Sequence, residues 1–194
     1  MTTRLMLTII LIAFYASHSI LAATSVKENL IPLIGYRYYR LFFNLISVIG
    51  LIAVIWVFRQ TEASLLLEPS PILYIIGGLL LLTGLVVGFF ASRQYDLGEF
   101  SGTSYLTKEN AEDQTLNTTG INGLVRHPLY LSLLLLMFAW FCFQSLSSIL
   151  TLNLATLAYV LVGVYFEEKK LIMQFGDDYL RYRSEVKMLI PFLL

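Results

Sequence analysis

Residues Pro128 to Phe166 read PLYLSLLLLMFAWFCFQSLSSILTLNLATLAYVLVGVYF, and none of these 39 residues is charged. As one straight helix this stretch would be about 58 Å long, nearly twice the thickness of the hydrocarbon core of a bilayer. It must therefore fold back on itself, and the polar cluster at 144–148 is the predicted turn. The sequence predicts two membrane-spanning helices here, over about 129–144 and 148–166, in a tight hairpin.

Three further apolar stretches, over 5–23, 41–58 and 72–91, have the length that crosses a bilayer and carry no Asp, Glu, Lys or Arg. The first could instead be a signal peptide, because Arg4 precedes it and two alanines end it. Its apolar core is long for that role, however, and His18 interrupts it. We therefore predict five transmembrane helices.

The composition agrees with a membrane protein. The chain has 194 residues, 57% of them hydrophobic and only 13% charged, with a net charge of zero, whereas a soluble domain carries about 25% charged residues. The single cysteine, Cys142, excludes an intrachain disulfide and a cysteine-built metal site, and zero net charge gives no reason to expect nucleic acid as a partner. We expect an all-α, polytopic membrane helix bundle forming one integral membrane domain over residues 1–194.

Basic residues predict the orientation, because they collect in cytoplasmic loops. Five spans place Arg4 and Arg59 on one side and the remaining eleven of the 13 lysines and arginines on the other. An uninterrupted fourth span would move five tail residues across and leave seven against six. The sequence thus predicts an external N-terminus and a cytoplasmic C-terminus, in a bacterial inner membrane or an endoplasmic reticulum.

Two polar segments lie on the predicted cytoplasmic side. The connection over 92–127 is rich in glycine and polar residues and is expected to be irregular. The tail, 167–194, is expected to form an amphipathic helix along the membrane or the bundle, broken at Gly176 and capped anew by Asp177. Its stripe recurs at spacings of four, four, three and four residues and consists of Leu171, Phe175, Tyr179, Tyr182 and Val186.

Ionisable residues converge on that same side, which suggests a pocket open to the cytoplasm. Asp96 and Glu99 follow the third span, and His127 opens the fourth. Glu167 and Glu168 end the fifth.

These residues could also have purely structural roles. Arg126 could anchor the chain at the membrane surface, Pro128 could start a helix, and Glu167 and Glu168 could be a solvated pair. The hairpin disfavours them, because it returns Glu167 and Glu168 beside His127 and Tyr130 at one membrane depth. A base, a phenol and two carboxylates would form a binding site for a polar, cationic ligand.

Two motifs in this region resemble those of the integral membrane methyltransferases related to isoprenylcysteine carboxyl methyltransferase and the phospholipid methyltransferases. The first is L-x3-G-x5-R-H-P-x-Y, from Leu116 to Tyr130, and the second is E-E-x2-L-x3-F-G-x2-Y-x2-Y-x3-V-x4-P, from Glu167 to Pro191. The first half of the chain, with ASHS at 16–19, is more similar to two offshoots of that superfamily. These are the membrane thiol methyltransferases and membrane proteins associated with nitrite and nitric oxide reduction.

The resemblance implies S-adenosylmethionine as the cofactor, S-adenosylhomocysteine as its product, and no metal. Carboxylates and aromatic faces could hold the sulfonium and ammonium of the cofactor. The residues expected to bind it are Val125, Arg126, His127, Pro128, Tyr130, Glu167, Glu168, Tyr179 and Tyr182.

The methyl acceptor stays open among lipophilic and small thiol or carboxylate compounds. Ser132 and Asn122 depart from the family pattern, and the arginine that the family usually has before the glutamate pair is absent from 163–166. These departures argue against assigning the isoprenylcysteine substrate to this chain. The positively charged residues where the second span begins would suit an anionic acceptor or a thiolate. Arginines at this position could also simply anchor the span at the headgroups. The residues predicted for this acceptor end are His18, Arg37, Arg40 and Asn44.

Two other functions remain possible at this stage. His18 and His127 are the only histidines and could together ligate a haem. The chain could also keep the fold as a membrane partner without catalysis.

Overall fold

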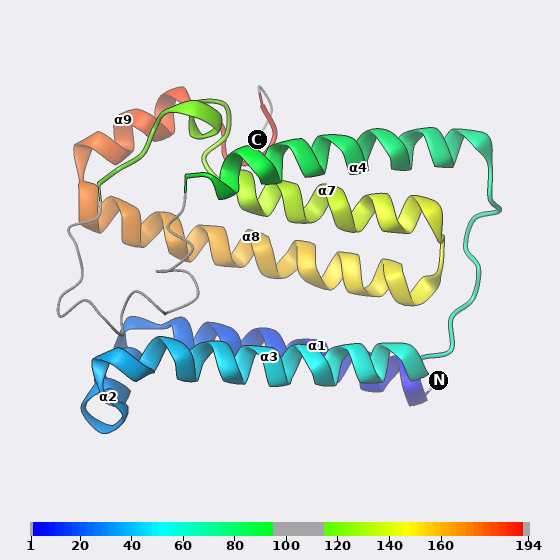
Figure 1. Cartoon of the computed structure of the whole chain (residues 1–194), viewed down its shortest axis with the longest axis horizontal. Coiled ribbons are helices and arrows are strands. Elements are labelled where there is room, and N and C mark those ends of the chain that lie inside the picture. The colour runs from blue at the N-terminus through cyan, green and yellow to red at the C-terminus, as the bar shows by residue number, and fades with distance from the viewer. Residues whose placement is uncertain (1, 95–114, 192–194) are drawn as a thin grey trace. The chain divides into compact units, whose positions relative to one another are not determined.

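The computed structural model describes residues 2–94 and 115–191, and its regular elements in these ranges are all helices (Figure 1). The expected all-α class is therefore confirmed. The chain divides into two compact units. The described elements are α1 (Thr2–Ala22), α2 (Thr24–Ile34), α3 (Tyr36–Gln60), α4 (Pro71–Ser92), the 3-10 helix η1 (Gly120–Gly123), α7 (Pro128–Phe143), α8 (Ser147–Phe175) and α9 (Asp177–Glu185).

The first unit packs α1 against α3, with α2 as the connection between them. Gly50 allows a close approach of the two long helices, because a Cβ there would lie 2.7 Å from Cδ2 of Phe14. The sequence did not predict α2: it contains Pro32, and none of its residues is buried. Gly35, at φ +89°, ends α2 and lets the chain turn into α3.

The second unit places α7 between α4 and α8 (Figure 1). Glycines bring α4 close to α7: a Cβ on Gly84 would lie 3.0 Å from Cδ2 of Leu136, and one on Gly88 would lie 2.5 Å from Oγ of Ser132. Ser132 donates a hydrogen bond of 2.8 Å to the carbonyl of Gly84. Small residues are a common means of packing helices in bilayers, so Ser132 takes part in this contact.

The predicted hairpin turn is confirmed, since α7 ends at Phe143 and α8 begins at Ser147. The segment before α4 lies along this turn. Leu66 N donates to Ser145 O at 2.7 Å, and Ser147 N donates to Ser64 O at 2.9 Å.

The tail differs from the expectation in two respects. The helix α8 runs without interruption from Ser147 to Phe175, so the last span and the first part of the tail are one helix of 29 residues. The expected break is at Gly176, with φ +54°, but Gly176 itself is the N-cap of α9. Asp177 is the first residue of that helix and provides no side-chain cap, which corrects the predicted capping role.

Among the described residues, four helices are long and apolar enough to cross a membrane by length and composition: Thr3–Ala22, Tyr38–Gln60, Pro71–Ser92 and Ser147–Phe175. The structure is thus that of a polytopic helical membrane protein. The remaining expected span corresponds to α7, an apolar helix of only 16 residues, so the count of five and the single membrane domain stay predictions. Asp96 and Glu99 lie outside the described residues.

Candidate functional site

The two sequence motifs meet where α7 begins. The strand-like segment before α7 pairs with the segment after α9: Arg126 N donates to Lys187 O at 2.8 Å, and His127 N donates to Met188 O at 3.1 Å. Val125 is buried in this pairing, and Pro128 is the buried first residue of α7. Backbone hydrogen bonds therefore fix the end of the tail against the start of the hairpin.

Glu168, on α8, accepts contacts from three basic side chains. Arg126 donates to its Oε1 through Nε at 2.8 Å and also through Nη2. Arg183 Nε lies 3.3 Å from Oε2, and His127 Nε2 lies 3.4 Å from Oε1. The side chains of Arg126 and Glu168 are only 7% and 8% exposed. Both carboxylate oxygens of Glu168 are thus occupied by the protein itself.

Arg126 also joins the tail through backbone carbonyls. Its Nη1 donates to the carbonyl of Arg183 at 3.2 Å and to that of Val186. The guanidinium consequently links the hairpin, α8 and the segment after α9.

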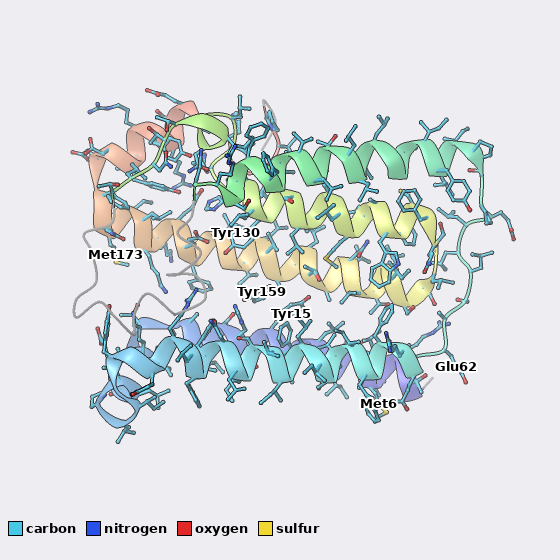
Figure 2. All side chains as sticks on the ribbon, in the orientation of Figure 1. Met6, Tyr15, Glu62, Tyr130, Tyr159 and Met173 are labelled. Carbon is cyan, nitrogen blue, oxygen red and sulfur yellow. The ribbon has the colours of Figure 1, made fainter. Side chains whose placement is uncertain are left out.

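Glu167 has a different environment, although it is the preceding residue. Tyr130 reaches from α7 toward α8 (Figure 2) and donates to Oε2 of Glu167 at 2.8 Å. His127 Nδ1 lies 3.9 Å from Oε1, beyond hydrogen-bond distance. The Glu167 side chain is 43% exposed. This carboxylate therefore keeps acceptor capacity that an external group could use.

His127 is held as a neutral imidazole. Burial lowers its pKa below the ordinary value of 6.5, and the neighbouring Glu167 and Glu168 carboxylates, which act in the opposite direction, do not outweigh burial. An ionised carboxylate can only accept a hydrogen bond, so the contact with Glu168 assigns the ring proton to Nε2. Nδ1 then carries a lone pair on the side of Glu167.

Two buried tyrosines of α9 complete the cluster. Their rings meet edge to face, with centroids 5.9 Å apart. Tyr182 donates to the backbone carbonyl of Asn122 at 2.6 Å, so that contact does not depend on which side chain stands at 122. The Tyr179 hydroxyl is buried and has no hydrogen-bond partner among the described residues. Burial raises the pKa of Tyr179, which therefore stays a protonated phenol and a potential donor.

The structure brings all the residues predicted for the cofactor end into one unit. The sequence analysis missed Arg183, whose Nε contacts Glu168. Arg183 stands at a variable position of the second motif, so no signal in the pattern distinguished it from the other charged residues of the tail.

The residues predicted for the acceptor end lie in the first unit. His18 Nδ1 is 3.1 Å from Oγ of Ser47, and its ring centroid lies 4.7 Å from that of Phe43. The Arg40 guanidinium lies 5.4 Å from the same Phe43 ring. Asn44 is partly buried, and nothing is described of the Arg37 side chain. His18 and Arg40 therefore share one aromatic neighbour.

The fold and the site define a class: polytopic helical membrane proteins with a carboxylate, histidine and tyrosine cluster at one end of a helical hairpin. Within this class the chain belongs to the NnrU protein family, whose model matches residues 6–191. The predicted similarity to the membrane proteins associated with nitrite and nitric oxide reduction is confirmed.

The chain is also similar to several proteins named methanethiol S-methyltransferase. It is 27% identical to one from Pseudomonas deceptionensis, over 97% of this chain and 73% of that protein. It is 27% identical to methanethiol S-methyltransferase 1 of Bradyrhizobium diazoefficiens, over 94% of this chain and 65% of that protein. It is 28% identical to a methanethiol S-methyltransferase of Crocosphaera subtropica, over 100% of this chain and 77% of that protein. No solved structure matches the chain.

Proposed function

We propose that this protein is an S-adenosylmethionine-dependent membrane methyltransferase that acts on a small thiol. The observation that carries the proposal is the joining of the two motifs around Glu167, Glu168 and His127. Relatives named methanethiol S-methyltransferase that align with nearly the whole chain favour a thiol over a prenylated cysteine or a lipid amine. They also favour catalysis over the haem and non-catalytic alternatives.

The residues of the cluster fit the cofactor chemically. When bound, S-adenosylmethionine supplies a methyl group on a positively charged sulfur. Glu167 offers a partly exposed carboxylate to a cationic group, and the hydrogen bond from the Tyr130 hydroxyl orients that carboxylate. The unpartnered hydroxyl of Tyr179 is a donor that a polar ligand could satisfy. Glu167, Tyr130 and Tyr179 would therefore hold the cofactor directly.

Glu168 has a positioning role in this proposal. Its oxygens are occupied by Arg126, Arg183 and His127, so it has little capacity left for a ligand. The ion pairs fix the tail on the hairpin, and they hold the imidazole of His127 in one orientation. Alignment of this kind is the main contribution that a protein can make to an in-line displacement.

His127 can accept the proton that a thiol must lose. The bound cofactor would supply the methyl group to the acceptor sulfur, and the thiol proton would have to move to a base. Nδ1 of His127 is the lone pair available for it, because Nε2 carries the proton donated to Glu168. The Glu167 carboxylate, 3.9 Å away, would stabilise the imidazolium that forms.

The test uses the purified full chain and methyl-labelled S-adenosylmethionine. We expect label transfer to methanethiol, and none to a prenylcysteine or a phospholipid amine. Glu167→Gln and Tyr130→Phe should weaken cofactor binding by about 1 to 3 kcal/mol in calorimetric titration, since each removes a charged hydrogen bond. Wild-type protein without saturable cofactor binding would favour the non-catalytic alternative, and a Soret band with stoichiometric iron would favour haem.

A further inference from the structure

The first unit contains a polar pocket that the proposed reaction does not use. Its volume is about 160 Å³, and residues of α1, α2 and α3 line it. The polar lining consists of Lys27, Tyr36, Tyr39 and Arg40, and the apolar lining consists of Phe43 and the last two residues of α1. His18 and Asn44, two of the four residues of the predicted acceptor end, are not part of the lining, whereas Arg40 is.

The charged residues that the structure describes in the lining of this pocket have one sign. Lys27 and Arg40 bring two cations, and no carboxylate is among the described residues that line it. The helix α3 begins at Tyr36, and its N-cap residue, Gly35, has no side chain to cap it, so the partial positive charge of this N-terminus adds to that of the two cations. Tyr39 donates to the carbonyl of Leu21 and so occupies an acceptor at the end of α1 that would otherwise repel an anion. The lining therefore suits an anionic group with hydrogen-bond acceptors.

The pocket also lies at the ends of two candidate spans, where a bilayer would place its lipid headgroups. It is formed at the last residues of one candidate span, α1, and at the first residues of another, α3. Beside it, α2 has no buried residue and exposes apolar side chains, including Leu33 at 81% exposure. A short helix of this kind between two spans is typical of the bilayer interface, where basic pockets between helices bind anionic headgroups.

We propose that the pocket formed by Lys27, Tyr36, Tyr39 and Arg40 binds the phosphate of an anionic phospholipid. Lys27 and Arg40 would contact the phosphate, and Phe43 with the end of α1 would contact the first part of the lipid chain. The chemistry recognised is a phosphate anion, and the apolar lining favours a lipid over a free phosphate as its source. This assigns Arg40 to lipid binding and goes beyond the proposed methyl transfer.

The experiment is titration of the detergent-purified full chain with phosphatidylglycerol or phosphatidylcholine, read by native mass spectrometry. We expect preferential binding of phosphatidylglycerol. Lys27→Gln and Arg40→Gln should each weaken it about fivefold and the double variant about 25-fold, from the usual contribution of one basic residue near an anionic membrane. Arg40→Lys keeps the charge and should retain most of the binding.

Arg93→Gln is the matched control, because the Arg93 guanidinium lies 5.2 Å from the Phe89 ring in the second unit, much as Arg40 lies over Phe43. It should leave lipid binding unchanged, and the melting temperature of each variant reports whether it is folded. Equal binding of the two lipids, or an equal loss in Arg93→Gln, would overturn the proposal. Inorganic phosphate that displaces the lipid at comparable concentration would show that the pocket takes a soluble anion instead.

Discussion

Glu167 and Glu168 illustrate how much one position along a helix can change the role of a carboxylate. Successive helical residues point about 100° apart, since a turn contains about 3.6 residues. Glu168 is consequently directed toward Arg126 and is buried, while Glu167 is partly exposed beside Tyr130. Sequence reasoning treated them as an equivalent pair, because the two letters are identical and the burial depends on the packing of the tail.

Glu168→Ala is expected to destabilise the fold. It would leave the buried Arg126 guanidinium without its carboxylate, and removal of one partner of a buried ion pair costs about 3 to 5 kcal/mol. The midpoint of thermal unfolding in detergent measures the effect. Glu167→Ala is the matched control, since its side chain is 43% exposed and should affect cofactor affinity far more than unfolding. Equal midpoints for the two variants would contradict the positioning role.

A second prediction at this scale concerns pH and His127. Burial lowers the pKa of His127 in the folded protein, so the unfolded chain binds a proton more readily than the folded one below about pH 6.5. The contribution of this histidine to stability is fully present above pH 6.5 and is lost as the pH falls through the window below it. We expect the melting temperature to fall between pH 7.5 and pH 5.5, and to fall less in His127→Gln. An identical pH dependence in that variant would show that other groups control it.

At the scale of helices, apolar length predicted the spans, whereas the remaining elements depend on contacts between distant segments. Uncharged stretches near 20 residues correspond to α1, α3, α4 and, with the polar turn, to α7 and α8. The helix α2 escaped prediction because it buries nothing and contains Pro32. The sequence did not predict the pairing of 125–127 with 187–188 either, since this pairing is long-range and involves only backbone groups that every residue carries.

Adjacent glycines of α4 provide a test of its packing on α7. A Cβ on Gly77 would lie 2.9 Å from the Phe143 ring and 3.0 Å from Cβ of Cys142, while one on Gly78 would meet nothing within 4 Å. Gly77→Ala is therefore expected to cost about 1 to 3 kcal/mol through overpacking, whereas Gly78→Ala should change little. Thermal unfolding of the two variants measures the difference. If both alanines behave alike, the close approach of α4 and α7 is not as described.

At the scale of the whole molecule, the second unit provides an argument about how many times the chain crosses the bilayer. The segment before α4 hydrogen-bonds to the turn between α7 and α8, through Ser64 with Ser147 and Leu66 with Ser145. The other end of α4 lies near the start of α7, because a Cβ on Gly88 would lie 2.5 Å from Oγ of Ser132. The ends of α7 are therefore matched to the ends of α4, although α7 has 16 residues and α4 has 22. If α4 spans the bilayer, α7 must cross it as well, at about 24 Å of helix.

The last prediction is the topology that follows. Five crossings place Arg4 and Arg59 on one side and the other eleven basic residues on the opposite side, which the positive-inside rule makes cytoplasmic. The same side would hold His127 and Glu167, as a site for a cofactor made in the cytoplasm requires. A reporter fused after Leu194 should therefore be cytoplasmic, and one inserted between Thr61 and Ser70, in the connection from α3 to α4, should be external. If both reporters were on one side, α4, α7 and α8 together would cross the membrane an even number of times. The hydrogen bonds that join the 64–66 segment to the hairpin turn would then have to be absent in the membrane.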